Sequence, residues 1–359
     1  MRQEAIRDQP TTTFPEPFVS IYRSRSIPIP ATLLTALAAL SFAGCETIYR
    51  GVSGPGRGHD AASAASAAAT APAYADDGAK LAACEGVAGC LSVLTFNTKH
   101  RDVPVQSQAT YRKLKADFPR LPDFLLLQEV VYDRPTKNGA LDNTAAEMAA
   151  ALGCNVNGEA RDGGSEGVAI LSPHPFAFTD HLHIRARDNL FSGGFPRVSV
   201  MVECQVPGIG LVRVVNVHLT QRPSQNDIRI AQLKETLDWM NARQAASRAD
   251  VIILGGDFNS HPDWSDRAML NDPSACGGVA FHDFNSATAT SGNVGDPYER
   301  VDYFYVGCPN GAAGGGASGG ISSVGERILW RGGIPTLDNA TMFWPSDHMP
   351  LLQVYSVAR

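Results

Sequence analysis

An apolar stretch in the second half of the chain stops abruptly at a carboxylate and a carboxamide. Residues 251–254 are all apolar, two glycines follow, and Asp257 and Asn259 come next, one residue apart. Residues two apart on an extended segment point the same way, so a strand would deliver both side chains together. Asp and Asn offer hard oxygen to a divalent cation or a water, and Asn also donates to a phosphoryl oxygen. On its own, the same stretch is also compatible with a turn or a helix cap.

Other apolar segments of the chain end in the same way, in polar side chains of metal-binding or phosphate-binding type. These are Asn97 after 91–96, Gln128 and Glu129 after 124–127, Asn216 and His218 in 212–218, Asp302 in 300–306, and Ser346, Asp347 and His348 before 351–354. Six independent caps would be a coincidence, whereas one shared pocket explains all of them. The pattern therefore predicts six strands that present their polar residues to one site.

In this order the motifs resemble those of the endonuclease/exonuclease/phosphatase superfamily. Its members include pancreatic-type deoxyribonucleases, abasic-site endonucleases, inositol-polyphosphate phosphatases and bacterial sphingomyelinases. The family motifs are an early Asn, Gln-Glu, Asn-x-His, Gly-Asp-x-Asn, Asp-Tyr and a closing Ser-Asp-His, and all are present here between Asn97 and His348. The resemblance covers residues 91–359. It implies an α/β fold, a four-layered αββα sandwich of two mixed β-sheets flanked by helices, with the active site at one end.

The resemblance also implies catalytic roles for the residues at the strand ends. Asp257 would orient or deprotonate the attacking water, and Asn259 would hold that water. His348 and Asp302 would form a hydrogen-bonded pair on the scissile phosphate. Either Asp257 or the Asp302–His348 pair would be the general base.

Three further residues are expected to contact the phosphoryl group: His218, Asn216 and Arg197. A buried, satisfied histidine and an ordinary surface arginine are the alternatives for the first and last of these. The expected metal ligands are Glu129, Asn97 and Asp347. Hard oxygen ligands select Mg²⁺ or Mn²⁺ over Zn²⁺.

Two other features are assigned no chemistry. The histidines His174, His181 and His183 have no carboxylate cluster beside them in the sequence, and we assign them to a loop. The segment 227–242 has apolar residues at helical spacing, which predicts a helix that packs on the core.

The first 90 residues differ in composition from the rest. An apolar run from Ile27 to Ala43 follows Arg23 and Arg25 and is short for a membrane span, as is typical of a secretory signal. Residues 40–45 resemble a lipoprotein box, in which Cys45 would be lipidated and become the mature N-terminus. Ordinary cleavage after Ala43 would instead give a soluble periplasmic protein. The basic segment before the run is long for a signal, which leaves the true start codon open.

These observations predict three parts: a signal or lipoprotein segment at 1–45, a low-complexity tether rich in Ala, Gly and Ser at 46–90, and a catalytic domain at 91–359. The protein would be periplasmic, anchored to the outer membrane through a lipid on Cys45, or secreted. Six cysteines remain besides Cys45, and an even number in an exported chain predicts disulfides. The favoured pairs are Cys84 with Cys90 and Cys276 with Cys308. Small buried hydrophobic residues are the alternative reading of these cysteines.

The net charge of −6, without a basic stripe, disfavours tight non-specific binding of a nucleic-acid duplex but does not exclude a transient nuclease. We therefore predict a monomeric, exported, divalent-metal-dependent phosphoesterase that hydrolyses a phosphodiester in a nuclease-like manner. A phospholipid or inositol-phosphate headgroup is the alternative substrate. A catalytically inactive surface-binding lipoprotein and an unrelated β-rich lipoprotein are the alternatives from other classes.

Overall fold

The computed structural model describes residues 87–358 apart from 88, 100–103, 119, 136–140, 163, 188–195, 285–288, 294–295 and 310–319. These residues fall within one compact unit, Ala69–Arg359. The predicted signal segment 1–45 and residues 46–86 of the predicted tether lie outside the described residues. Within the described part, no helix has the length and apolar character that crossing a membrane requires.

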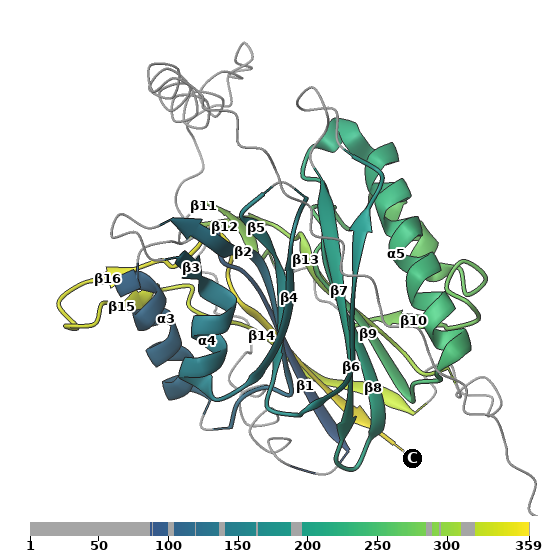
Figure 1. Ribbon diagram of the computed structural model, residues 1–359, viewed down its shortest axis with the longest axis horizontal. Helices are drawn as coiled ribbons and strands as arrows, with labels where there is room; N and C mark the ends of the chain where they lie inside the picture. Colours follow the sequence, from purple (N-terminus) through teal and green to yellow (C-terminus); the bar gives the residue numbers. More distant parts are fainter. Residues whose placement is uncertain are drawn as a thin grey trace, which may run out of the picture. The chain divides into compact units, whose positions relative to one another are not determined.

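Two mixed β-sheets form the centre of this unit (Figure 1). In spatial order, the first sheet contains β14 (Ile321–Ile328), β17 (Leu351–Val357), β1 (Cys90–Asn97), β2 (Phe124–Pro135), β5 (Glu166–Ser172) and β4 (Asn155–Ala160), with β3 (Leu141–Asn143) joined to β2. The second contains β10 (Phe281–Asp283), β13 (Asp302–Gly307), β9 (Val251–Asp257), β8 (Gly210–His218), β7 (Arg197–Val206) and β6 (Phe176–Ile184). Each sheet has one parallel pair, β1 with β2 and β8 with β9, among antiparallel ones.

Small elements complete the described part. The two-stranded ribbons are β11 (Ser291–Asn293) with β12 (Asp296–Glu299), and β15 (Ile334–Pro335) with β16 (Met342–Phe343). Two 3₁₀ turns occupy Pro223–Gln225 and Ser265–Asn271. A strand lies at each of the six predicted positions.

Helices cover the outer faces of the two sheets (Figure 1). The helices α3 (Pro104–Asp117) and α4 (Thr144–Leu152) pack on the first sheet, and α5 (Asn226–Ala246) packs on the second. Asn143 caps the start of α4 by accepting a 3.0 Å hydrogen bond from the amide of Ala146. The order helix, sheet, sheet, helix confirms the four-layered sandwich, and α5 confirms the predicted helix at 227–242.

The core contains three hydrophobic clusters, one between the two sheets and one on the outer face of each sheet. In β1, Leu91 and Val93 face the space between the sheets, while Leu94 and Phe96 face α3 and α4. Both faces of such a strand are apolar because both are covered. A fully buried side chain of this kind contributes roughly 1.5–3 kcal/mol, so the strands are firmly held up to their polar ends.

The cysteines correct one prediction. Cys154, Cys204, Cys276 and Cys308 are free thiols, so the predicted Cys276–Cys308 disulfide is wrong. Burial raises the pKa of the Cys276 and Cys308 thiols to about 11, as expected for small buried hydrophobic residues. Cys84 lies outside the described residues, and its bond to Cys90 stays a prediction.

Candidate active site

Strand pairing brings the predicted catalytic residues to one end of the sandwich. In the second sheet, the parallel pairing of β8 with β9 sets His218 opposite Asp257, and the antiparallel pairing of β13 with β9 sets Asp302 on the other side of Asp257. In the first sheet, β1 ends at Asn97, beside the end of the paired part of β2. The site therefore draws on both sheets, and its residues come from strands that are distant in sequence.

Asp257 is the centre of this site. The side chain of Asn97 reaches across from the first sheet and donates a 3.0 Å hydrogen bond to Oδ2 of Asp257. The amide of Asn259 donates to Oδ1 at 2.9 Å. Nε2 of His218 and Nε2 of His348 lie 3.6 Å and 3.8 Å from Oδ2. A carboxylate held at both oxygens between two imidazoles is well placed to accept a proton.

His348 and Asp302 form the predicted pair. Nδ1 of His348 lies 3.0 Å from Oδ2 of Asp302, and both side chains are buried. The Asp302 carboxylate therefore orients the ring so that Nε2 points toward Asp257 and the site. Ser291, on the β11 ribbon, places its hydroxyl 3.2 Å from the same Nε2.

The buried charges shift the pKa values of both residues. Burial raises the pKa of Asp257 to about 7; the nearby charge of Asp302 adds to this, while His348 and hydrogen bonds from Asn97 and Asn259 oppose it. Burial would lower the pKa of His348, but Asp302 and Asp257 outweigh it and raise that pKa to about 10. His348 is therefore cationic at neutral pH, and Asp257 is poised to gain or lose a proton there.

Glu129 reaches the site through a local irregularity of β2. A β-bulge interrupts the pairing of β2 with β5 at this residue, and its φ of 54° is in the left-handed region. Nδ2 of Asn97 donates to its carboxylate at 3.0 Å. Lys99 and Asn259 also have positive φ, at 52° and 49°. Such strain in residues other than glycine concentrates at functional sites.

Of the predicted metal ligands, Glu129 contacts Asn97 directly, and Asp347 is connected to them through Lys99. Glu129 is the hydrogen-bond partner of Asn97, and the amide of Lys99 donates to Oδ1 of Asn97 at 2.9 Å. Lys99 also carries its ammonium to Oδ2 of Asp347, at 2.6 Å, which ties this part of the site to the closing motif. Two carboxylates and one amide carbonyl are a donor set suited to a hard divalent cation.

Arg197 and His218 form a second pair beside the centre. The Arg197 guanidinium lies 3.1 Å from Nδ1 of His218, and both residues line a pocket at the open edge of the site. The pocket is lined by Glu129, Arg161, Glu166, Gly167, Val168, Pro196, Arg197, Val198 and His218. Arg161 is paired with Glu166 at 3.1 Å, so Arg197 is the arginine of this lining that we expect to meet a phosphate.

Asn216 lies elsewhere, which corrects its predicted contact with the phosphoryl oxygens. Its side chain is fully buried between the sheets and donates to the carbonyl oxygens of Leu127, at 2.8 Å, and Ala169, at 2.9 Å. Its Oδ1 accepts a 2.7 Å hydrogen bond from Gln128. Both amide hydrogens are therefore used inside the fold, and Asn216 joins the two sheets.

The side-chain amide of Asn259 forms a hydrogen bond within the fold. Its Nδ2 donates to the carbonyl oxygen of Leu219 at 3.0 Å, while its backbone amide holds Asp257. The water-holding role stays a prediction.

Sequence reasoning missed Ser291 and Lys99. Nothing in the sequence marks Ser291, because it meets His348 only through an isolated bridge between the β11 ribbon and the closing motif. Lys99 did carry a signal, since it follows Asn97 by two residues.

Comparison with known proteins gives one family. The sequence matches the model of the Endonuclease/Exonuclease/phosphatase family over residues 94–348. A comparison with curated proteins gave no match.

Solved structures resemble the fold closely enough to identify it. Truncated TDP2 of Caenorhabditis elegans is 19% identical, with a TM-score of 0.54 over 75% of this chain and 98% of that one. ANGEL2, a 2′,3′-cyclic phosphatase, is 18% identical, with a TM-score of 0.54 over 74% and 95%. TDP2 of Danio rerio, complexed with a single-strand DNA product, is 14% identical, with a TM-score of 0.50 over 74% and 98%.

Proposed function

The chain belongs to the endonuclease/exonuclease/phosphatase family, a family of phosphoester-hydrolysing enzymes, and from this premise we propose that it is a divalent-metal-dependent hydrolase that cleaves a phosphodiester bond in a nucleic acid. The observation that carries the proposal is the buried carboxylate of Asp257, held by Asn97 and flanked by His218 and the His348–Asp302 pair.

The proton chemistry follows from this arrangement. Asp257 accepts the proton of the attacking water, because it is the carboxylate at the centre of the site and its pKa is near neutrality. His348, cationic and oriented by Asp302, donates a hydrogen bond from Nε2 to a phosphoryl oxygen. His218 contacts the same phosphoryl group from the other side and is supported by Arg197.

Glu129, Asn97 and Asp347 would hold the cation, Mg²⁺ or Mn²⁺ by the chemistry of their oxygens. When bound, the cation neutralises charge on the phosphoryl group and polarises it.

Proteins of similar fold favour a nucleic acid over a lipid headgroup as the substrate. One of them is described as a 2′,3′-cyclic phosphatase, and another is described in complex with a single-strand DNA product.

A substrate panel tests the function: plasmid DNA, single-stranded DNA, RNA, sphingomyelin vesicles and phosphoinositides, each with and without Mg²⁺. We expect Mg²⁺-dependent cleavage of nucleic acid by the wild-type protein and its loss in Asp257→Asn and Glu129→Gln. Cleavage of lipid headgroups only would establish the alternative substrate. Failure to hydrolyse even bis-p-nitrophenyl phosphate would establish a catalytically inactive binding protein.

We also propose that the protein is exported and anchored through Cys45, on the evidence of the apolar run from Ile27 to Ala43 and the lipoprotein-like residues after it. Fractionation of cells that produce the wild-type protein or Cys45→Ser tests this. Membrane association should be lost in the variant. Equal amounts of both proteins in the soluble periplasmic fraction would instead indicate simple signal cleavage.

A further inference from the structure

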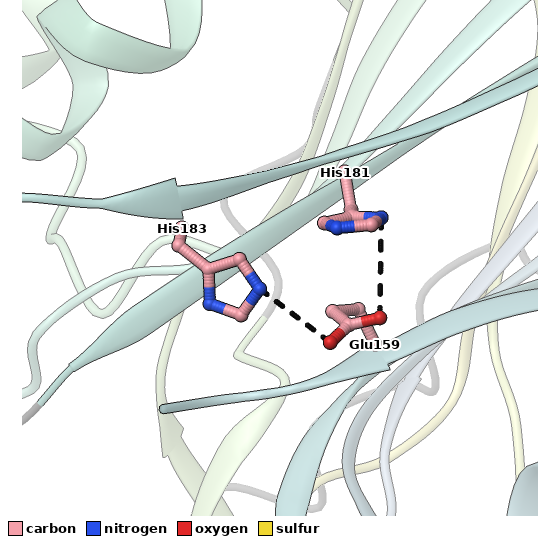
Figure 2. Close-up of side chains that lie close together, drawn as sticks. All are labelled: Glu159, His181 and His183. Carbon is pink, nitrogen blue, oxygen red and sulfur yellow. Dashed lines mark ion pairs between the residues drawn. The ribbon is translucent and has the colours of Figure 1, made fainter. Parts of the chain in front are cut away.

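Two histidines and a glutamate meet at the open side of the sandwich, outside the site described above. His181 and His183 belong to β6, the edge strand of the second sheet, and Glu159 belongs to β4, the edge strand of the first. His181 and His183 are two apart on one strand and so project on the same side. Figure 2 shows both imidazole rings beside the carboxylate of Glu159. This corrects the prediction that these histidines lie in a loop without carboxylates.

The three side chains are close enough to share one ion. Nε2 of His183 lies 3.4 Å from one oxygen of Glu159, and Nδ1 of His181 lies 3.9 Å from the other (Figure 2). One ligand atom from each residue lies within 4.8 Å of the other two. Ligand bonds of about 2.0–2.2 Å from nitrogen and oxygen require these atoms to lie somewhat closer together, and the three side chains are partly or fully exposed.

A second carboxylate stands behind His183. Oδ1 of Asp162 lies 2.7 Å from Nδ1 of His183, on the far side of the ring from Glu159. The contact has the length of an ion pair. Asp162 is in turn paired with Arg187 at 3.1 Å. A carboxylate on the distal nitrogen is the usual support of a histidine that binds a metal, because it fixes the tautomer and leaves Nε2 free to coordinate.

We propose that Glu159, His181 and His183 bind a transition-metal ion of the Zn²⁺ class. Two imidazoles and one carboxylate suit Zn²⁺, whereas Mg²⁺ and Ca²⁺ prefer oxygen ligands. The site is distinct from the oxygen-rich site around Asn97 in position and in donor type. The proposal is independent of the reaction that the protein catalyses.

The two rings stand 5.4 Å apart and both approach the same glutamate. A metal ion would use both rings as neutral donors.

The position of the ion suggests what it does. Within the described sheets, β4 pairs only with β5 and β6 pairs only with β7, so the two edge strands have no backbone bonds to each other. The ion would join them. Glu159 lies two residues before Arg161, and the neighbour of His183 in β6, Ile184, is paired with Arg197. Both arginines line the phosphate pocket, so the ion would hold that pocket's outer wall.

Zn²⁺ binding to the metal-stripped full chain tests the proposal, with Mg²⁺ in excess to occupy the oxygen site. We expect calorimetry and elemental analysis to give one Zn²⁺ per chain, and added Zn²⁺ to raise the midpoint of thermal unfolding. Co²⁺ bound in place of Zn²⁺ should give a visible absorption spectrum typical of nitrogen ligands. The His181→Ala/His183→Ala variant should lose all three. Glu159→Gln, which keeps the shape of the side chain, should bind Zn²⁺ more weakly, and Asp162→Asn should bind it about 10–100-fold more weakly.

His282→Ala is the matched control, because His282 is a partly exposed histidine on β10, the edge strand at the opposite side of the same sheet. It should bind Zn²⁺ as the wild-type protein does. Unchanged Zn²⁺ binding in both the double variant and Glu159→Gln, or absence of Zn²⁺ binding by the wild-type protein, would overturn the proposal.

Discussion

With Asp257 as the proposed general base, its raised pKa predicts a pH dependence of the reaction. A general base works when it is ionised, so kcat/KM should rise with pH through a limb near pH 7 when little metal is bound. A bound cation favours the carboxylate and should move this limb to lower pH. Asp257→Asn should reduce the rate by roughly 10²–10⁴ and abolish the limb. The measurement is a pH profile at two Mg²⁺ concentrations.

Asp250→Asn is the control, because Asp250 lies at the other end of β9 and accepts a hydrogen bond from Leu211. Its profile should match that of the wild-type protein. If the rise of kcat/KM with pH persisted in Asp257→Asn, the general base would instead be the Asp302–His348 pair.

The pair itself predicts non-additive kinetics. His348→Ala should reduce the chemical step by roughly 10²–10⁴, about 3–5 kcal/mol, because the variant loses its cationic donor. Asp302→Ala should cost less, since Asp302 acts through His348. The double variant should lose far less than the product of the two single effects. Single-turnover rates measure this, with folded fractions determined in parallel because both side chains are buried. Independent, multiplicative losses would refute the pairing.

Residue types and spacing at the strand ends predict which residues gather at the site. They do not predict the direction in which every side chain points. Strand register sets Asp257 beside Asp302, and His348, from the segment before β17, contacts both as predicted. Asn216 precedes His218 by two residues and was expected to share its role. The cross-sheet carbonyls that bind its amide come from β2 and β5, which no local pattern in 212–218 reveals.

At the scale of elements, apolar runs that end in polar residues predict the strands, whereas irregular strand pairing is not predicted. The bulge at Glu129 depends on how β2 pairs with β5, and the sequence of β2 reads as an ordinary strand. The segment that contains His181 and His183 alternates in burial as an edge strand does. No carboxylate cluster lies beside the histidines in the sequence, because their carboxylate partner, Glu159, comes from the other sheet.

The cross-sheet amide at Asn216 should contribute to stability and not to chemistry. Asn216→Ala leaves the Leu127 and Ala169 carbonyls and the Gln128 amide without this partner, which should cost about 1–3 kcal/mol of unfolding free energy. Among folded molecules, kcat/KM should remain close to the wild-type value. Urea unfolding and initial rates at low temperature measure the two quantities.

Asn155→Ala provides the comparison. Asn155 also donates to two carbonyl oxygens, those of Ser172 and His174, but it is exposed at the edge of the first sheet. Water replaces its hydrogen bonds, so its loss should change stability little. A large drop in kcat/KM for Asn216→Ala without loss of stability would return Asn216 to the phosphate.

At the scale of the molecule, the two ends of the sandwich are held differently. The catalytic end concentrates buried carboxylates and imidazoles, whose shifted pKa values reflect electrostatic strain. Away from the site, a charged network joins α5 to the second sheet. Glu203 of β7 accepts hydrogen bonds from Arg213 of β8, at 2.9 Å from Nε, and from Arg243 of α5, at 2.6 Å from Nη2. Arg213 is fully buried and Glu203 nearly so.

This network predicts acid sensitivity of the whole fold. Burial would raise the pKa of Glu203, but hydrogen bonds and charge from Arg243 and Arg213 outweigh it and lower that pKa below its usual value. A carboxylate with a lowered pKa contributes stability above its unfolded pKa of about 4.3, and that contribution is lost as pH falls through the folded value. Glu203→Gln should therefore reduce stability at pH 7, by about 3–5 kcal/mol, because Arg213 is left buried without its charged partner. Below the folded pKa the difference between the two proteins should shrink.

Denaturant unfolding of both proteins from pH 7 down to acid pH measures this effect, with Asp238→Asn as the control on the same helix. Asp238 pairs with Lys234 at 2.6 Å, but both side chains are more than half exposed, so that pair should contribute no more than about 1 kcal/mol. Equal, small losses in Glu203→Gln and Asp238→Asn would mean that packing, and not the charged network, attaches α5 to the sheet. A large loss confined to Glu203→Gln that fades toward acid pH would identify the network as the attachment, because packing of apolar side chains has no such dependence on pH.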